Sequence, residues 1–142
     1  MRLTETEALR RLASHDHGTL ATVHPDRGVD AVPVVYAVTN GFVGVPIDRV
    51  KPKSSFRLQR EQNLEADPRA ALLIERWDRD DWSKLWWVRA ELRHEVSPAS
   101  DLIASLAAQL SEAFMHYQDQ PFAGMLVLRI EAVSGWSASR AD

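Results

Sequence analysis

The feature that most restricts how this chain can fold is the dipeptide Asn40-Gly41, which joins a valine-rich segment, 29–38, to an apolar segment, 42–47. Asn-Gly between two such segments is the strongest short-range signal of a two-residue β-hairpin, because both residues tolerate the positive φ that this turn requires. We therefore expect two antiparallel strands here. Pro33 cannot donate to a ladder hydrogen bond, so the first strand should bend or lie at a sheet edge.

Other segments carry the residue types of further strands and helices. Apolar and β-branched residues predict strands at 19–23, 69–76, 85–96 and 125–130, the last continuing at 133–136. Helices are expected up to Ser14 after a Thr4 cap, from Ser54 or Ser55 to about Leu64, and from Ser97 to 116–119. Six strands with few helices predict a mainly β domain, a closed or nearly closed antiparallel barrel spanning 1–142.

The charge balance and composition exclude several classes of function. The 17 Lys+Arg against 20 Asp+Glu leave a net charge of -3, which disfavours general nucleic-acid binding. The chain has no cysteine, its histidines are too scattered for a metal site, and a glycine-rich dinucleotide loop is absent. No apolar run approaches a membrane span and the charged N-terminal segment lacks a signal-peptide pattern, so a cytoplasmic protein without membrane contact is expected.

A basic cluster is the first candidate site. It consists of Arg49, Lys51, Lys53, Arg57 and Arg60. The cluster follows a predicted strand and runs into a predicted helix start, where free N–H groups favour an anion. One interpretation is a clamp for a phosphate or polycarboxylate, and the other is a solvated basic helix face.

A tryptophan-rich segment is the second candidate, since four of the five tryptophans lie between Trp77 and Trp87. On a strand, Trp86 and Trp87 point to opposite faces, so one can fill the barrel while the other needs a different apolar partner. Arg89 shares a face with Trp87. The outer face could meet a flat ring, or it could form a subunit interface without any ligand.

In their order along the chain, several motifs resemble a known superfamily. They are 18–23 (GTLATV), 32–36 (VPVVY) and 60–70 (REQNLEADPRA). The chain resembles the split β-barrel superfamily of pyridoxamine 5'-phosphate oxidases and coenzyme F420-dependent oxidoreductases. The stretch 81–89 (DWSKLWWVR), together with 51–53 (KPK), looks like an actinobacterial subgroup of the deazaflavin branch.

The resemblance implies a six-stranded antiparallel split barrel and a homodimer with two cofactors between its subunits. In such proteins a lysine three residues before the Asn contacts the cofactor phosphate, and here Arg60 precedes Asn63 by three, keeping the charge. The implied cofactor-binding residues are Pro33, Val34, Val35, Pro46 and Ile47 along the ring, Lys51, Lys53, Arg57 and Arg60 at the phosphate, and Trp86, Trp87 and Arg89 on the ring or substrate side, from the same chain or the partner.

The implied activity is hydride transfer between reduced coenzyme F420 and a small organic substrate, because a deazaflavin carries an acidic tail that suits extra cations. The alternatives are an FMN-dependent oxidoreductase and a protein that binds either cofactor without turnover. Tyr36 and His94 are the residues considered as proton donors, but nothing in the sequence singles out either one, so the catalytic group stays unassigned.

Overall fold

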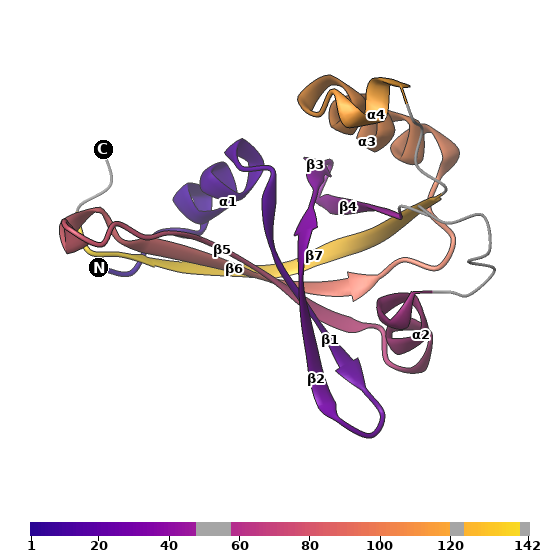
Figure 1. Cartoon of the computed structure of the whole chain (residues 1–142), viewed down its shortest axis with the longest axis horizontal. Coiled ribbons are helices and arrows are strands. Elements are labelled where there is room, and N and C mark those ends of the chain that lie inside the picture. Colours follow the sequence, from indigo (N-terminus) through magenta and orange to yellow (C-terminus); the bar gives the residue numbers. More distant parts are fainter. Residues whose placement is uncertain (48–57, 120–123, 140–142) are drawn as a thin grey trace.

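The computed structural model describes residues 1–47, 58–119 and 124–139, and Figure 1 shows a curled antiparallel sheet with helices on its outside. The sheet has seven strands in the order β2-β1-β5-β6-β7-β4-β3. The strands are β1 (His17–His24), β2 (Gly28–Val35), β3 (Ala37–Thr39), β4 (Phe42–Ile47), β5 (Arg69–Arg76), β6 (Trp86–His94) and β7 (Gly124–Ser137). The helices are α1 (Glu5–Ser14), α2 (Gln59–Ala66), the short 3-10 turn η1 (Trp82–Lys84), α3 (Ser100–Ala113) and α4 (His116–Asp119). The architecture is the expected split barrel.

The described strands number seven rather than the predicted six, because the segment 29–38 forms two strands. The chain turns a corner at Tyr36, whose backbone N–H donates to the Asp16 carbonyl at 2.9 Å and whose hydroxyl donates to the Leu12 carbonyl at 2.6 Å. β2 and β3, on either side of this corner, are the two outermost strands of the sheet. The corner therefore brings the two edges of one sheet together, and Pro33 lies on an edge strand as expected.

The predicted hairpin at Asn40-Gly41 is confirmed. Thr39 pairs with Phe42, and the two residues between them have φ of 49° and 82°. Two positive φ values in a two-residue loop match the twist of the strands it joins.

Two of the three helices begin or end elsewhere than predicted. α2 begins at Gln59 after Leu58, rather than at Ser54 or Ser55, which lie outside the described residues. α3 begins after Ala99 instead of Ser97 and ends at Ala113, so 116–119 is a separate short helix. Neither helix start has a side-chain hydroxyl cap. At α2 the Glu61 carboxylate accepts from the Leu58 N–H at 2.8 Å instead, whereas α3 is stabilised by burial of Leu106 and Leu110.

Two apolar clusters hold the fold together. The first fills the barrel, with side chains such as Leu20, Leu72 and Leu128 fully buried. The second lies between the sheet and α3, around Leu106 and Leu110. No helix in the described part of the chain is long and apolar enough to cross a membrane.

Asn63 fastens α2 to the barrel, and its side chain is fully buried. The amide Nδ2 donates to Thr22 Oγ1 on β1 and to Asp30 Oδ2 on β2, both at 2.9 Å. The amide oxygen accepts from Gln59 Nε2 at 2.9 Å. A single side chain thus fixes the position of the helix relative to two strands.

We expect Asn63→Ala to lower the free energy of unfolding by about 2–3 kcal/mol, because it leaves buried partners without their hydrogen bonds. Urea denaturation measures this change. Gln62→Ala, an exposed change on the same helix, is the control and should alter stability by less than about 0.5 kcal/mol. Equal effects of the two substitutions would show that the buried amide does not anchor α2.

Candidate functional site

A groove opens where the sheet's two edges face each other. β3 pairs only with Phe42–Gly44 of β4, so the rest of β4 has no described strand on that side, and β2 pairs only with β1. Between these edges lies a cavity of about 330 Å³. Its lining residues are His17, Gly18, Pro33, Val34, Val35, Val45, Pro46, Arg60 and Tyr117. The volume lies at the lower end of the range of small-molecule sites.

The walls of the groove combine apolar side chains with backbone polar groups. Every second residue of an edge strand directs its N–H and C=O away from its only neighbour. β2 therefore presents outward backbone groups at alternate residues along 33–35, and Pro33 has no N–H to donate. Such an edge can hydrogen-bond the rim of a flat heterocycle while valine side chains contact its face.

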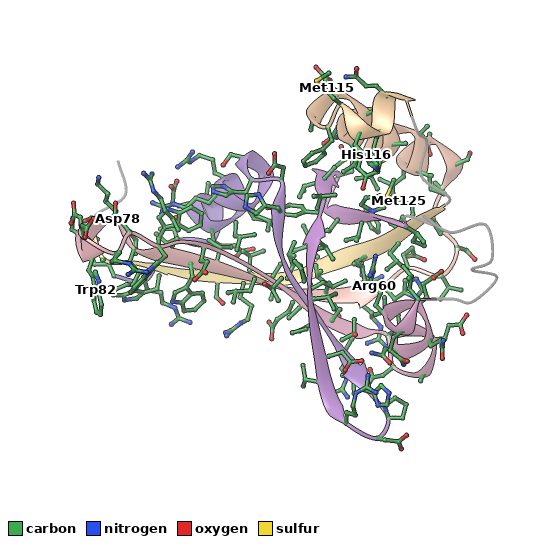
Figure 2. The ribbon with its side chains drawn as sticks, viewed as in Figure 1. Arg60, Asp78, Trp82, Met115, His116 and Met125 are labelled. Carbon is green, nitrogen blue, oxygen red and sulfur yellow. The ribbon has the colours of Figure 1, made fainter. Side chains whose placement is uncertain are left out.

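Arg60 forms one end of the groove and is the residue that the motif resemblance aligns with a phosphate-contacting lysine. Its Nε is buried and has no hydrogen-bond partner among the described residues. Figure 2 marks Arg60 beside α2, and it is the second residue of that helix. The positive end of the helix dipole and the guanidinium therefore act at the same place, which favours an anion there.

The helix that carries Arg60 is set by the polar contacts of its neighbours. Arg60 and Asn63 are three residues apart, so they lie on one face of α2, and the buried Asn63 amide turns that face toward β1 and β2. Hydrogen bonding from Asn63, and then from Arg27, holds the pKa of Asp30 below its ordinary value. The carboxylate therefore stays charged and continues to accept from the amide.

Of the twelve predicted cofactor-binding residues, the structure brings five together in the groove: Pro33, Val34, Val35, Pro46 and Arg60. Lys51, Lys53 and Arg57 lie outside the described residues, as does Arg49. The side chain of Ile47 is buried in the barrel core and does not line the groove. No described contact joins Trp86, Trp87 or Arg89 to the groove of the same chain.

The two strand tryptophans point to opposite faces, as predicted. Trp86 is buried and meets the His15 ring edge-on at 4.8 Å between centroids. Trp87 is half-buried on the other face, where the Arg89 guanidinium carbon lies 5.4 Å from its ring centroid.

The structure places both possible proton donors away from the groove. The Tyr36 hydroxyl is bonded to the Leu12 carbonyl in the core, and burial raises its pKa far above the ordinary value. His94 lies at the end of β6, where burial lowers its pKa. Neither side chain lines the groove.

His17, Gly18, Val45 and Tyr117 line the groove but were missed as site residues. His17 and Gly18 open β1, directly beside the predicted site strand, and a turn-to-strand boundary is the signal that could have found them. Asp16 Oδ1 lies 2.9 Å from His17 Nδ1. Tyr117 comes from α4, more than fifty residues from Arg60, so only the tertiary structure reveals it. Within 1–47, 58–119 and 124–139, no group of three or more acidic or histidine side chains could hold a metal ion.

No family model matches the chain, and no curated protein matches its sequence. Several solved structures do match the fold. An FAD-binding protein of Mesorhizobium loti is 19% identical, with a TM-score of 0.72 over 95% of this chain and 93% of that protein. A heme-binding protein of Mycobacterium smegmatis is 20% identical, with a TM-score of 0.71 over 100% of this chain and 57% of that one. A protein of Corynebacterium glutamicum, assigned as a pyridoxamine 5'-phosphate oxidase, is 18% identical, with a TM-score of 0.58 over 96% and 98%. At these identities, the likeness establishes the split-barrel fold.

The segment that follows α2 generates a pH prediction. Hydrogen bonds from the Arg69 guanidinium and backbone lower the pKa of Asp67 from 3.8 to about 2. Because the folded-state pKa is depressed, this stabilisation is present above pH 3.8 and is lost as the pH falls through about 2. We expect Asp67→Asn to lose less stability than the parent chain between these pH values, as measured by urea unfolding midpoints. Asp26→Asn, which changes an exposed carboxylate outside any described ion pair, is the control and should follow the parent chain.

Proposed function

We propose that the groove between β2 and β4 binds a phosphate-bearing flavin-type cofactor, and that the chain is an oxidoreductase acting on a small organic molecule. The buried Nε of Arg60, which has no partner among the described residues, is the observation that carries this proposal. A buried donor without an acceptor costs free energy, and a cofactor phosphate would supply the acceptor.

The electrostatics of the groove's end support the same ligand. The N-terminus of α2 adds positive potential beside the guanidinium. In the sequence, Lys51, Lys53 and Arg57 directly precede this helix, so further cations are close along the chain. A chain with net charge -3 concentrates positive charge here, which suits one local anion rather than a nucleic acid.

The other end of the groove suits an aromatic ring. Val34, Val35 and Val45 offer apolar surface, and the edge of β2 offers backbone hydrogen-bonding groups. When bound there, a flavin or deazaflavin supplies the hydride chemistry. His17 is the histidine on the wall, and its Nδ1 contact with Asp16 leaves Nε2 to exchange a proton with a substrate.

Two features bear on the identity of the cofactor. The motif resemblance and the number of nearby cations favour coenzyme F420, whose tail is acidic. The FAD-binding and pyridoxamine 5'-phosphate oxidase-like structures with this fold favour a flavin such as FMN instead. We propose F420-dependent hydride transfer as the first reading and FMN-dependent transfer as the alternative, with cofactor binding without turnover as the third.

A second copy of the chain would complete the site. On the outer face of β5, β6 and β7, Leu73 lies opposite Arg89, and Trp87 lies opposite Trp136. Leu73 and Trp136 are 40% and 38% exposed. Exposed apolar and aromatic side chains beside an arginine are typical of a protein interface. We propose that this face forms a homodimer, with Trp87 and Arg89 contributed toward the partner's groove.

We expect Arg60→Ala to weaken cofactor binding by about 10- to 100-fold, because a charge-assisted hydrogen bond to phosphate contributes roughly 1.5–3 kcal/mol. Fluorescence-quenching titrations with F420 and with FMN measure this loss. Arg129→Ala removes an exposed cation on β7 and should bind like the parent chain.

The same titrations separate the alternatives. Tighter binding of F420 than of FMN supports the first reading, and the reverse order supports the alternative. If hemin binds, as measured by a shift of its Soret band, while neither F420 nor FMN binds, the proposal is overturned. Bound reduced cofactor that passes hydride to no acceptor would identify a carrier rather than an enzyme.

For the dimer, we expect Leu73→Asp to convert the protein to monomers in sedimentation-velocity experiments, because it places a carboxylate in the apolar face. Val96→Asp, which changes a residue 82% exposed outside that face, should leave the oligomeric state unchanged. A parent chain that sediments as a monomer, with or without cofactor, would contradict the proposed interface.

A further inference from the structure

A second cavity, of about 490 Å³, lies under the second half of α1, at the ends of β5, β6 and β7. None of its lining residues lines the groove. It lies next to η1, and Figure 2 shows Asp78 and Trp82 of that region at the opposite end of the molecule from Arg60. The proposed function leaves this cavity unused.

The lining of this second cavity is unusually cationic for a chain of net charge -3. Arg10, Arg11, Arg76 and Lys84 line it, against a single carboxylate, Asp81. Two acids outside the lining offset part of this charge. Glu7 binds Arg10 at 2.5 Å, and Asp78 lies 3.8 Å from Lys84. Glu7 Oε1 also accepts from Arg11 Nε at 2.9 Å, so Arg76 is the lining cation without a described ion pair, and Arg11 offers its two terminal nitrogens.

Arg11 is held in a fixed position over the cavity floor. Its side chain is only 11% exposed, and its Nε donates to Glu7 Oε1 at 2.9 Å. Its guanidinium carbon lies 4.9 Å from the ring centroid of the buried Trp86. No described residue accepts from its two terminal nitrogens. This leaves a pre-oriented fork of N–H groups, the geometry that matches carboxylate and phosphate oxygens.

Arg76 and Ser137 stand beside Trp86 on the same face of the sheet. The strand register pairs Arg76 with Trp86 and Trp86 with Ser137, and directly paired residues point the same way. Arg76 has no ion-pair partner among the described residues. Ser137 is only 4% exposed and also lines the cavity. Three donors therefore converge from α1, β5 and β7.

We propose that this second cavity binds a small organic oxyanion carrying at least two negative charges on phosphate or carboxylate groups. Arg11 and Arg76 bind the anionic oxygens, Ser137 donates a further hydrogen bond, and Trp86 forms the apolar floor. The site is independent of the groove and of the proposed cofactor.

Calorimetric titration of the full chain with pyrophosphate and with citrate at low ionic strength tests this site. We expect at least one probe to bind with a Kd in the millimolar range or below, and Arg76→Gln to weaken it about tenfold, as loss of a charge-assisted contact does. Arg79→Gln makes the same charge change in the neighbouring exposed loop and should leave the Kd unchanged. Thermal unfolding checks that both variants fold.

The probes and variants give distinct outcomes. Binding of pyrophosphate alone assigns a phosphoryl ligand, citrate alone assigns a carboxylate ligand, and either supports the site. Binding of neither probe, or equal weakening by Arg76→Gln and Arg79→Gln, would overturn it. Loss of probe binding in Arg60→Ala but not in Arg76→Gln would show that the probe binds in the groove, and would overturn the second site. Because Arg76→Gln should leave flavin titrations unchanged, this inference can fail without the proposed function failing.

Discussion

The corner at Tyr36 is the constraint on which the rest of this molecule depends. Its hydroxyl and backbone N–H are tied to the carbonyls of Leu12 and Asp16, so the chain must leave β2 and enter β3 at a fixed angle. Since β2 and β3 are the two outermost strands, the corner forces the edges of one sheet to face each other. The groove is the gap that this incomplete closure leaves, and its backbone polar groups remain available to a ligand.

The buried amide of Asn63 positions the helix that carries the groove's cation, Arg60. By binding Thr22 and Asp30 at once, it sets α2 against the barrel so that Arg60, one turn earlier, closes the end of the groove. The helix dipole and the guanidinium then act on the same point in space. A buried donor left without an acceptor is tolerated where a ligand supplies one, which is why this position is the strongest indication of function in the chain.

The groove and the second cavity differ in the charge of the residues that line them. The groove has one described cation at its end and apolar walls, which suits a ring with a phosphate tail. The second cavity has several cations, small hydroxyl side chains and one indole, which suits a compact and more highly charged molecule. Trp86 and Trp87 lie on opposite faces because neighbouring strand residues point opposite ways. Trp86 lies under α1 at the second cavity, and Trp87 lies on the exposed sheet face proposed to meet a second subunit.

The sequence predicts a structural feature correctly where that feature depends on neighbouring residues. Features that depend on neighbouring residues were predicted, and the structure agrees with them. They are the Asn40-Gly41 turn, the Thr4 cap of α1, the bounds of β4 and β5, and the place of Arg60 relative to Asn63. Other features do not follow from neighbouring residues, because each is decided by packing against distant segments. They are the start of α2, the extra strand after Tyr36 and the contribution of Tyr117 to the groove. The sequence by itself determined that strands, turns and a cation before an Asn would occur in this order. Only the tertiary structure decided which edges meet, and hence which side chains share a cavity, because burial and long-range hydrogen bonds outweigh local propensity once the sheet curls.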